Sequence, residues 1–231
     1  MAVYPFFMTE STWATDLFDT LLAEYGPQSW WPGEHAIEII VGAILTQRTS
    51  WENAARAISS LKAQGLLAFS EIDRARSQVL EAAIRPSGCF RAKAAKLKAF
   101  AAHVMERHTG SLDRFLALPT GRLREELLGI HGVGPETADA IALYAAKVPL
   151  FVVDAYTRRL LERLGRLLGG ETYDAVQQAF TQNLPEDAVL FNEYHALIVR
   201  HGKDRCRTRP VCADCPLASE CSYPPFGGVA V

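Results

Sequence analysis

The chain has 231 residues, of which 49% are hydrophobic and 22% charged, and its formal net charge is −2 at pH 7. These proportions are typical of a globular protein and exclude a fibrous or disordered chain. The length suits one large domain or two small domains that share an interface. No stretch approaches the ~18 apolar residues of a membrane span. The first basic residue is Arg48, so the basic start of a secretory signal is missing and we expect a cytoplasmic protein.

Charge is distributed unevenly along the sequence. The first 47 residues contain no Lys or Arg. Basic residues then gather in two runs, within 85–98 and within 200–209. Charge runs are usually solvated faces, but each of these predicts a local basic patch where an anion can bind.

Apolar residues recur at helical spacing in four stretches, at 37–45, 97–104, 160–168 and 190–198. Gly- and Pro-rich breaks separate these stretches and predict about ten short helices. Residues 148–153 are the one run that resembles a strand, and an extended connector between two helices accounts for them more economically. The predicted fold is therefore all-α.

Residues 130–138 read as a helix end, a glycine-rich turn and a new helix. Gly132 and Gly134 permit a tight turn, and Pro135 suits the first position of the following helix. Backbone amides at such a helix start can bind a phosphate without any side-chain charge. A Gly-x-Gly turn alone is equally typical of an ordinary corner between helices.

Four cysteines crowd the C-terminal region, with five, two and five residues between them: Cys206, Cys212, Cys215 and Cys221. Disulfides are disfavoured in a cytoplasmic protein, and structural zinc normally uses two close pairs, whereas only Cys212 and Cys215 are close here. An iron–sulfur cluster fits this spacing better, with zinc or unrelated cysteines as the alternatives. Cys89 stands apart and is predicted to be a small packing residue rather than a nucleophile.

Taken together, residues 45–49, the loop at 88–94, the turn at 132–138, Val153-Asp154 and the four cysteines resemble the endonuclease III family of DNA glycosylases. The resemblance implies two interlocked helical domains. A six-helix barrel with a helix-hairpin-helix would span 28–148, and an iron–sulfur domain would combine 1–27 with 149–231. It further implies a 4Fe-4S cluster on the four cysteines, although the family usually has six residues in the first cysteine interval.

The same resemblance assigns roles to individual residues. Gln47 matches the glutamine that fills the DNA stack, and Cys89 and Phe90 lie on the loop that wedges the opposite strand. Asp154 matches the catalytic aspartate, although an Asp before a helix is also typical of an N-cap. Lys203 is a candidate for binding phosphate or shaping the site.

Glu136 departs from the pattern, because lyase-active members of the family carry a lysine at this position. A glutamate cannot form a Schiff base, so the departure predicts a monofunctional enzyme that releases the base with water. Glu136 also suits the start of a helix, where the macrodipole favours a negative charge.

The 3-methyladenine branch of the family lines its base pocket with aromatic residues. This chain resembles that branch at Trp30, Trp31, Pro32 and Trp51. An electron-rich pocket favours a cationic alkylated adenine, whose bond to the sugar is already weak. The alternative is that these tryptophans are core residues.

The predicted function is therefore a monofunctional glycosylase that excises alkylated purines from double-stranded DNA. We expect a monomer associated with the nucleoid and without a membrane partner. Three alternatives stay open. They are a glycosylase for oxidised pyrimidines, an adenine-mismatch glycosylase, and a non-catalytic DNA-binding or redox-sensing iron–sulfur protein.

Overall fold

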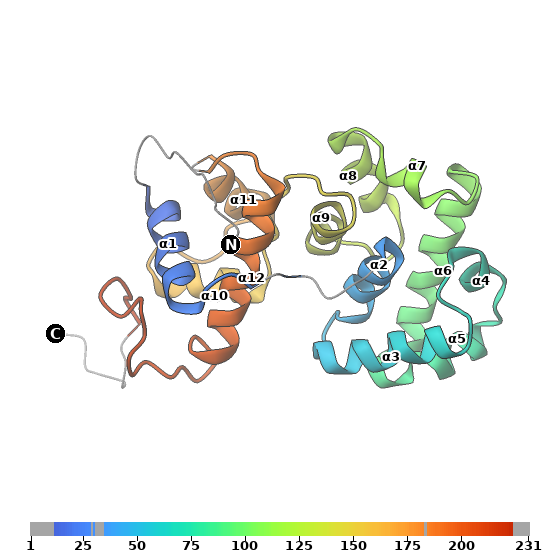
Figure 1. Ribbon diagram of the computed structural model, residues 1–231, viewed down its shortest axis with the longest axis horizontal. Coiled ribbons are helices and arrows are strands. Elements are labelled where there is room, and N and C mark those ends of the chain that lie inside the picture. The colour runs from blue at the N-terminus through green and yellow to red at the C-terminus, as the bar shows by residue number, and fades with distance from the viewer. Residues whose placement is uncertain (1–11, 29, 31–34, 183, 224–231) are drawn as a thin grey trace. The chain divides into compact units, whose positions relative to one another are not determined.

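A computed structural model describes residues 12–28, 30, 35–182 and 184–223. The chain divides into two compact units, a central unit of residues 31–152 and a terminal unit of residues 1–30 and 153–231. Within the described residues every regular element is a helix, which confirms the all-α prediction (Figure 1). None of these helices has both the length and the apolar character that crossing a membrane requires. The domain boundaries at residues 28 and 148 stay a prediction.

The central unit contains eight α-helices and a short 3-10 helix among its described residues: α2 (Ala36–Leu45), α3 (Trp51–Ala63), α4 (Phe69–Arg74), α5 (Ser77–Ala83), η1 (Arg85–Ser87), α6 (Phe90–Arg107), α7 (Leu112–Leu116), α8 (Thr120–Gly129) and α9 (Pro135–Tyr144). Helix α6 is central to its core, because Leu97, Phe100, Ala101 and Val104 recur at helical spacing and are fully buried. Phe100 stacks on Phe69, with ring centroids 5.2 Å apart.

The terminal unit combines the two ends of the described chain in one core. Its helices are α1 (Trp13–Tyr25), α10 (Ala155–Arg163), α11 (Tyr173–Thr181) and α12 (Ala188–Asp204). Tyr194 of α12 is fully buried, packs edge-on against Phe18 with centroids 5.2 Å apart, and donates a hydrogen bond of 2.8 Å to the carbonyl of Ala14. Residues about 180 positions apart thus close a single helical unit.

Two apolar stretches differ from regular helices. The run at 148–153 has no regular structure, and Phe151, Val152 and Val153 are buried within it, as an extended connector requires. The apolar stretch at 160–168 is not one helix, because α10 ends at Arg163 and Gly165 follows with a left-handed φ of 65°. Leu168 is consequently 97% exposed, so its expected place on a buried face is wrong.

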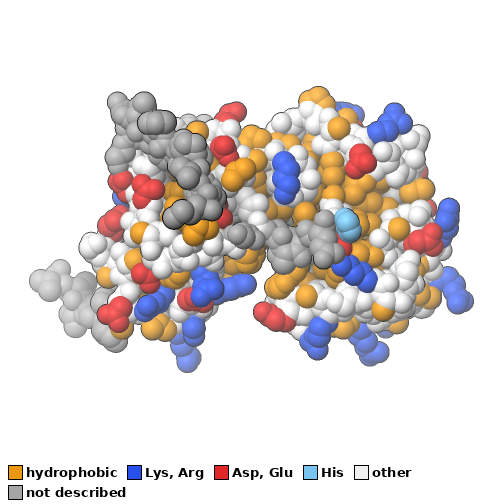
Figure 2. Space-filling model, in the orientation of Figure 1, with side chains coloured by type: hydrophobic (Ala, Val, Ile, Leu, Met, Phe, Trp, Pro, Cys, Tyr) orange, Lys and Arg blue, Asp and Glu red, His pale blue; other side chains and the backbone are white. Residues whose placement is uncertain are grey.

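One residue of the basic run at 85–98 is buried rather than exposed. Helical periodicity turns Lys93 inward, where it is 2% exposed and donates to the carbonyls of Leu45 at 2.8 Å and Ser87 at 2.6 Å. Burial lowers the pKa of this amine. Figure 2 shows basic and acidic side chains interspersed on the visible face of each unit. Lys93 therefore does not belong to the first predicted basic patch, whereas Arg85 and Arg91 are exposed and Lys96 and Lys98 partly exposed.

Candidate active site

Asp154 occupies the N-cap of α10 in an extended conformation, with φ −104° and ψ −175°. Its Oδ1 accepts hydrogen bonds from the backbone N–H of Thr157 at 2.8 Å and from the Thr157 hydroxyl at 3.0 Å. Both donors sit in the first turn of the helix, where backbone N–H groups lack intrahelical partners. One carboxylate oxygen is thus fixed by the helix start, and the orientation of the other follows from it.

The second oxygen of Asp154 faces His195 of α12, with Oδ2 and Nε2 3.5 Å apart. The side chains of Asp154 and His195 are only 14% and 7% exposed. Burial alone would raise the pKa of this carboxyl group, but the nearby His195 imidazole and the two Thr157 donors together hold the pKa below its usual value. Asp154 is therefore a buried carboxylate that stays ionised at neutral pH.

Of the four predicted pocket residues, Trp30 lies in the terminal unit and Trp51 in the central unit. The Lys203 ammonium lies over the Trp30 ring, 5.5 Å from its centroid. Trp51 begins α3 and is partly buried against the core of the central unit. Trp31 and Pro32 lie outside the described residues. The Trp30 ring thus already binds a cation, whereas Trp51 contributes to packing.

The glycine-rich turn joins α8 to α9 as predicted, with Pro135 at the start of α9. Gly132 has a left-handed φ of 83°, and a Cβ built there would lie 2.3 Å from Cγ of Lys96. In the described chain, the backbone hydrogen bond that closes this turn runs from Val133 N–H to Ile130 at 3.0 Å and uses neither glycine amide. Those two amides, of Gly132 and Gly134, stay the predicted phosphate contacts.

Gln47 follows α2 and packs against this turn. Its Nε2 donates to the carbonyl of Gly132 at 3.2 Å and to the Thr137 hydroxyl at 2.9 Å, and its Oε1 accepts from Nζ of Lys96. The Gln47 side chain thus ties the end of α2 to the turn before α9. Its predicted role in filling the DNA stack requires these bonds to be released.

Glu136 lies in the first turn of α9 and is exposed, as the macrodipole of a helix start favours. Cys89 is the N-cap of α6, with a left-handed φ of 44°, and its side chain is exposed. The expectation that Cys89 is a packing residue is therefore wrong, because the tight turn before α6 points it outward. Phe90 lies beside it, with the Arg85 guanidinium 5.6 Å from its ring centroid.

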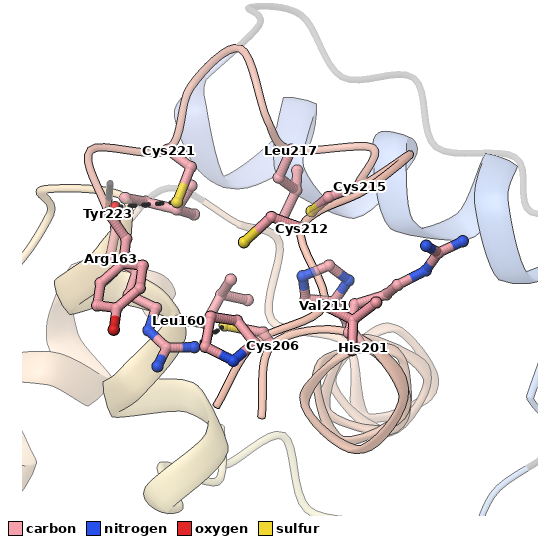
Figure 3. Close-up of a pocket in the computed structure, with 13 residues that line it drawn as sticks. Leu160, Arg163, His201, Cys206, Val211, Cys212, Cys215, Leu217, Cys221 and Tyr223 are labelled. Atoms are coloured by element: carbon pink, nitrogen blue, oxygen red, sulfur yellow. Dashed lines mark hydrogen bonds between the residues drawn. The ribbon is translucent and has the colours of Figure 1, made fainter. Parts of the chain in front are cut away.

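The four C-terminal cysteines line one cavity in the terminal unit, together with apolar side chains that include Leu160, Val211 and Leu217 (Figure 3). All four are free thiols. Arg163 donates from Nη1 to the sulfur of Cys206 at 3.1 Å, which places one cation beside the sulfur donors. Four thiols, an apolar lining and a neighbouring guanidinium have the chemistry that an anionic iron–sulfur cluster requires.

The sequence matches the model of the HhH-GPD superfamily of base excision DNA repair proteins over residues 41–186. The chain belongs to this superfamily. The matched region contains the glycine-rich turn, Glu136 and Asp154. The protein is accordingly a DNA glycosylase of the HhH-GPD type, as the resemblance implied.

Individual relatives agree with the superfamily. A candidate DNA repair glycosylase of Methanocaldococcus jannaschii, MJ1434, is 44% identical over 89% of this chain and 94% of its own length. Endonuclease III of Sulfolobus acidocaldarius is 28% identical over 80% of each chain. The structure of the H. pylori 3-methyladenine DNA glycosylase MagIII, bound to 1,N6-ethenoadenine, has a TM-score of 0.72 and 28% identity over 82% of this chain and 95% of its own.

Several contacts of this HhH-GPD site were not predicted from the sequence. Thr157 lies three residues after Asp154, and this spacing is typical of an N-cap hydrogen bond, so that contact could have been predicted. His195 lies 41 positions further along the chain, and no local pattern relates it to Asp154. The contacts of Lys96 and Thr137 with Gln47 are equally non-local.

Proposed function

We propose that this protein is a monofunctional DNA glycosylase that hydrolyses the N-glycosidic bond of alkylated purines such as 3-methyladenine. The observation that carries the proposal is the buried, ionised carboxylate of Asp154, held by Thr157 and His195. Hydrolysis of a glycosidic bond passes through an oxocarbenium-like sugar, which a fixed carboxylate stabilises. Because Thr157 holds Oδ1, Oδ2 is the oxygen that would face the sugar or orient the attacking water.

The absence of strand cleavage follows from Glu136. A lyase needs an amine that attacks the anomeric carbon and forms a Schiff base. In this chain a carboxylate occupies that position of the superfamily pattern, at the exposed start of α9. Water is then the nucleophile, and the product is an intact strand with an abasic site.

The preference for alkylated purines is supported by the Trp30 ring and by similarity. Lys203 shows that the face of this ring attracts a cation in the protein itself. A base such as 3-methyladenine is also cationic while bound to its sugar, and such a base leaves without protonation by a general acid. The H. pylori relative named as a 3-methyladenine DNA glycosylase shares 28% of its aligned sequence with this chain.

Binding of damaged double-stranded DNA would use the glycine-rich turn. Its amides and the positive end of the α9 dipole attract a phosphate, which explains how a chain with a net charge of −2 binds DNA. Base excision requires the damaged nucleotide to leave the stack, and a side chain must then fill the gap. Gln47 lies beside the turn and is our candidate for that residue.

We also propose that Cys206, Cys212, Cys215 and Cys221 hold a 4Fe-4S cluster, based on the cavity that they share and on the Arg163 guanidinium beside Cys206. When bound, such a cluster would supply a structural crosslink of the C-terminal loop. Equal amounts of iron and acid-labile sulfide, close to four of each per chain, are expected. Stoichiometric zinc in their place would contradict the cluster.

The function is tested by base release from duplex DNA methylated with a simple alkylating agent. We compare wild type with Asp154→Asn and with a matched control, Asp187→Asn. Asp187 is also a helix N-cap, with Oδ1 accepting from Val189 at 2.7 Å and Leu190 at 2.8 Å, but it caps α12. Asn caps helices as well as Asp does, so both variants should fold.

The expected result is release of 3-methyladenine without strand cleavage, lowered at least about 100-fold by Asp154→Asn and unchanged by Asp187→Asn. Equal release by wild type and Asp154→Asn would contradict a catalytic Asp154. The alternative substrate class is oxidised pyrimidines, which the similarity to endonuclease III favours. Release of an oxidised pyrimidine but no alkylated base would establish that alternative.

A further inference from the structure

Two histidines and one glutamate converge in the central unit, away from every residue assigned above. His103 lies in the penultimate turn of α6, His108 caps its C-terminus, and Glu126 lies on α8. Oε2 of Glu126 is 3.1 Å from Nε2 of His103 and 2.7 Å from Nε2 of His108. The three side chains are 16%, 10% and 10% exposed. Two imidazole nitrogens and a carboxylate oxygen thus meet at one shielded point.

We propose that His103, His108 and Glu126 bind a zinc ion. Their three ligand atoms lie within 4.8 Å of one another, and no other group of ligands among the described residues meets this condition. Zn–N and Zn–O bonds of about 2.0–2.2 Å in tetrahedral geometry place neighbouring ligand atoms about 3.4 Å apart. The observed N–O distances of 3.1 and 2.7 Å are slightly shorter. A small outward shift of Glu126 would bring both N–O distances to this value.

The surroundings hold these ligands in place. Phe115, which is fully buried, packs against both imidazoles, with ring centroids 5.4 Å from His103 and 4.8 Å from His108. Arg122 donates from Nε to Oε1 of Glu126 at 3.0 Å and leaves Oε2 toward the histidines. Outer-shell hydrogen bonds of this kind orient a carboxylate ligand.

The donor set selects the metal. Two neutral imidazoles and one carboxylate suit zinc and its neighbours in the first transition row, whereas magnesium and calcium prefer oxygen donors. Three protein ligands leave the fourth position for water. Glu126 offsets one of the two charges of the ion, while Glu125 offsets that of the neighbouring Arg122, with its Oε2 2.9 Å from Nη1 of Arg122.

A zinc ion bound at this position would affect the rest of the central unit. Zinc would join the end of α6 to α8, the helix that leads directly into the glycine-rich turn at Gly132. Metal binding restricts the elements that supply its ligands and stabilises the folded state by mass action. We therefore expect zinc to stiffen the segment that precedes the predicted phosphate contacts.

The test is the zinc content of the full chain after dialysis against micromolar zinc chloride. Glu126→Gln and the double variant His103→Asn/His108→Asn are compared with wild type and with His131→Asn, a matched control whose exposed histidine lies in the glycine-rich turn. Because the cysteine loop is intact in all four proteins, any zinc it binds is common to them. We expect wild type and His131→Asn to hold one equivalent more than the other two. Equal zinc content in all four would overturn the proposal.

A second measurement needs no variant at the site. Zinc chloride is added to wild type while the ring-nitrogen resonances of its histidines are recorded by NMR. Coordination should shift the Nε2 resonances of His103 and His108 and leave those of His131 unchanged, and magnesium chloride should shift none of them. Unchanged His103 and His108 resonances at saturating zinc would overturn the proposal even if the variants fail to fold.

Discussion

The ammonium of Lys203 lies 5.5 Å from the centroid of the Trp30 ring, so a cation of the protein occupies the aromatic face proposed for a cationic base. A charged base can use that face only when Lys203 moves away. The two cations therefore compete, whereas a neutral base such as 1,N6-ethenoadenine gains less from the ring charge.

Lys203→Met should raise kcat/KM for 3-methyladenine relative to kcat/KM for 1,N6-ethenoadenine. An exposed cation–π contact is worth about 0.5–1 kcal/mol, which corresponds to a change of about 2- to 5-fold in this ratio. Arg200→Met is the control, because Arg200 lies on the same helix and pairs with Asp204 at 2.5 Å. If the ratio of the two kcat/KM values is the same in Lys203→Met as in wild type, the Trp30 ring does not bind the base.

The depressed pKa of Asp154 predicts how its contribution to stability changes with pH. The folded-state pKa lies below the unfolded value of about 3.9, so the contribution is complete above that pH and is lost as the pH falls through the folded pKa. His195 and Thr157 are the groups that face the carboxylate. The difference in free energy of unfolding between wild type and Asp154→Asn, measured in urea, should not decrease from pH 7 to 5 and should shrink below about pH 4. A difference that shrinks between pH 7 and 5 would mean that the carboxyl group is not held ionised.

Gly132→Ala should destabilise the protein more than Gly134→Ala. At Gly132 a methyl group meets both a φ of 83° and the Lys96 side chain, whereas nothing lies within 4 Å of a Cβ at Gly134. A left-handed conformation costs a residue with a Cβ roughly 1–2 kcal/mol, and displacement of Lys96 would also break its bond to Gln47. Urea unfolding measures the difference. Equal losses in the two variants would contradict the close approach of Lys96.

Gln47→Ala should lower the free energy of unfolding by about 1–2 kcal/mol, because it removes the acceptor of Lys96 and the donor to Thr137. Gln64→Ala, an exposed control at the end of α3, should change it little. If base release falls while stability is unchanged, Gln47 acts on DNA alone and its contacts with the turn contribute nothing measurable.

Glu136→Lys should introduce an amine at the position where lyase-active relatives carry one. We expect borohydride to trap a covalent complex between this variant and DNA that contains an abasic site, and to trap none with wild type. Glu125→Lys is the control, because it makes the same charge change on an exposed part of α8. Trapping by wild type would contradict the monofunctional mechanism.

Sequence patterns predicted the parts of this protein that depend on neighbouring residues. The helical spacing in α6 and α12, the turn before Pro135 and the cap at Asp154 all follow from residues within one or two turns of helix. The failures have non-local causes. Lys93 reads as part of a basic run, yet buried carbonyls from two other segments bind its amine.

The side-chain contacts that were not predicted have the same origin. His195 meets Asp154 because α12 packs against α10, and Glu126 meets two histidines because α8 lies beside the end of α6. Neither contact follows from a periodic pattern in the sequence. In addition, the apolar pattern of residues 160–168 continues past Gly165, although the helix has already ended before this residue.

The division of the terminal unit between both ends of the chain sets an order for its synthesis. Residues 31–152 emerge from the ribosome as a complete unit, whereas α1 has to wait for α12 before Tyr194 can reach the carbonyl of Ala14. Until then α1 keeps apolar side chains such as Leu17 and Phe18 without their final partners. The cysteine loop follows α12, so the cavity that the four cysteines share can form only after α12 is made. A chain that stalls before residue 188 would have a folded central unit and an α1 that lacks its partner helix.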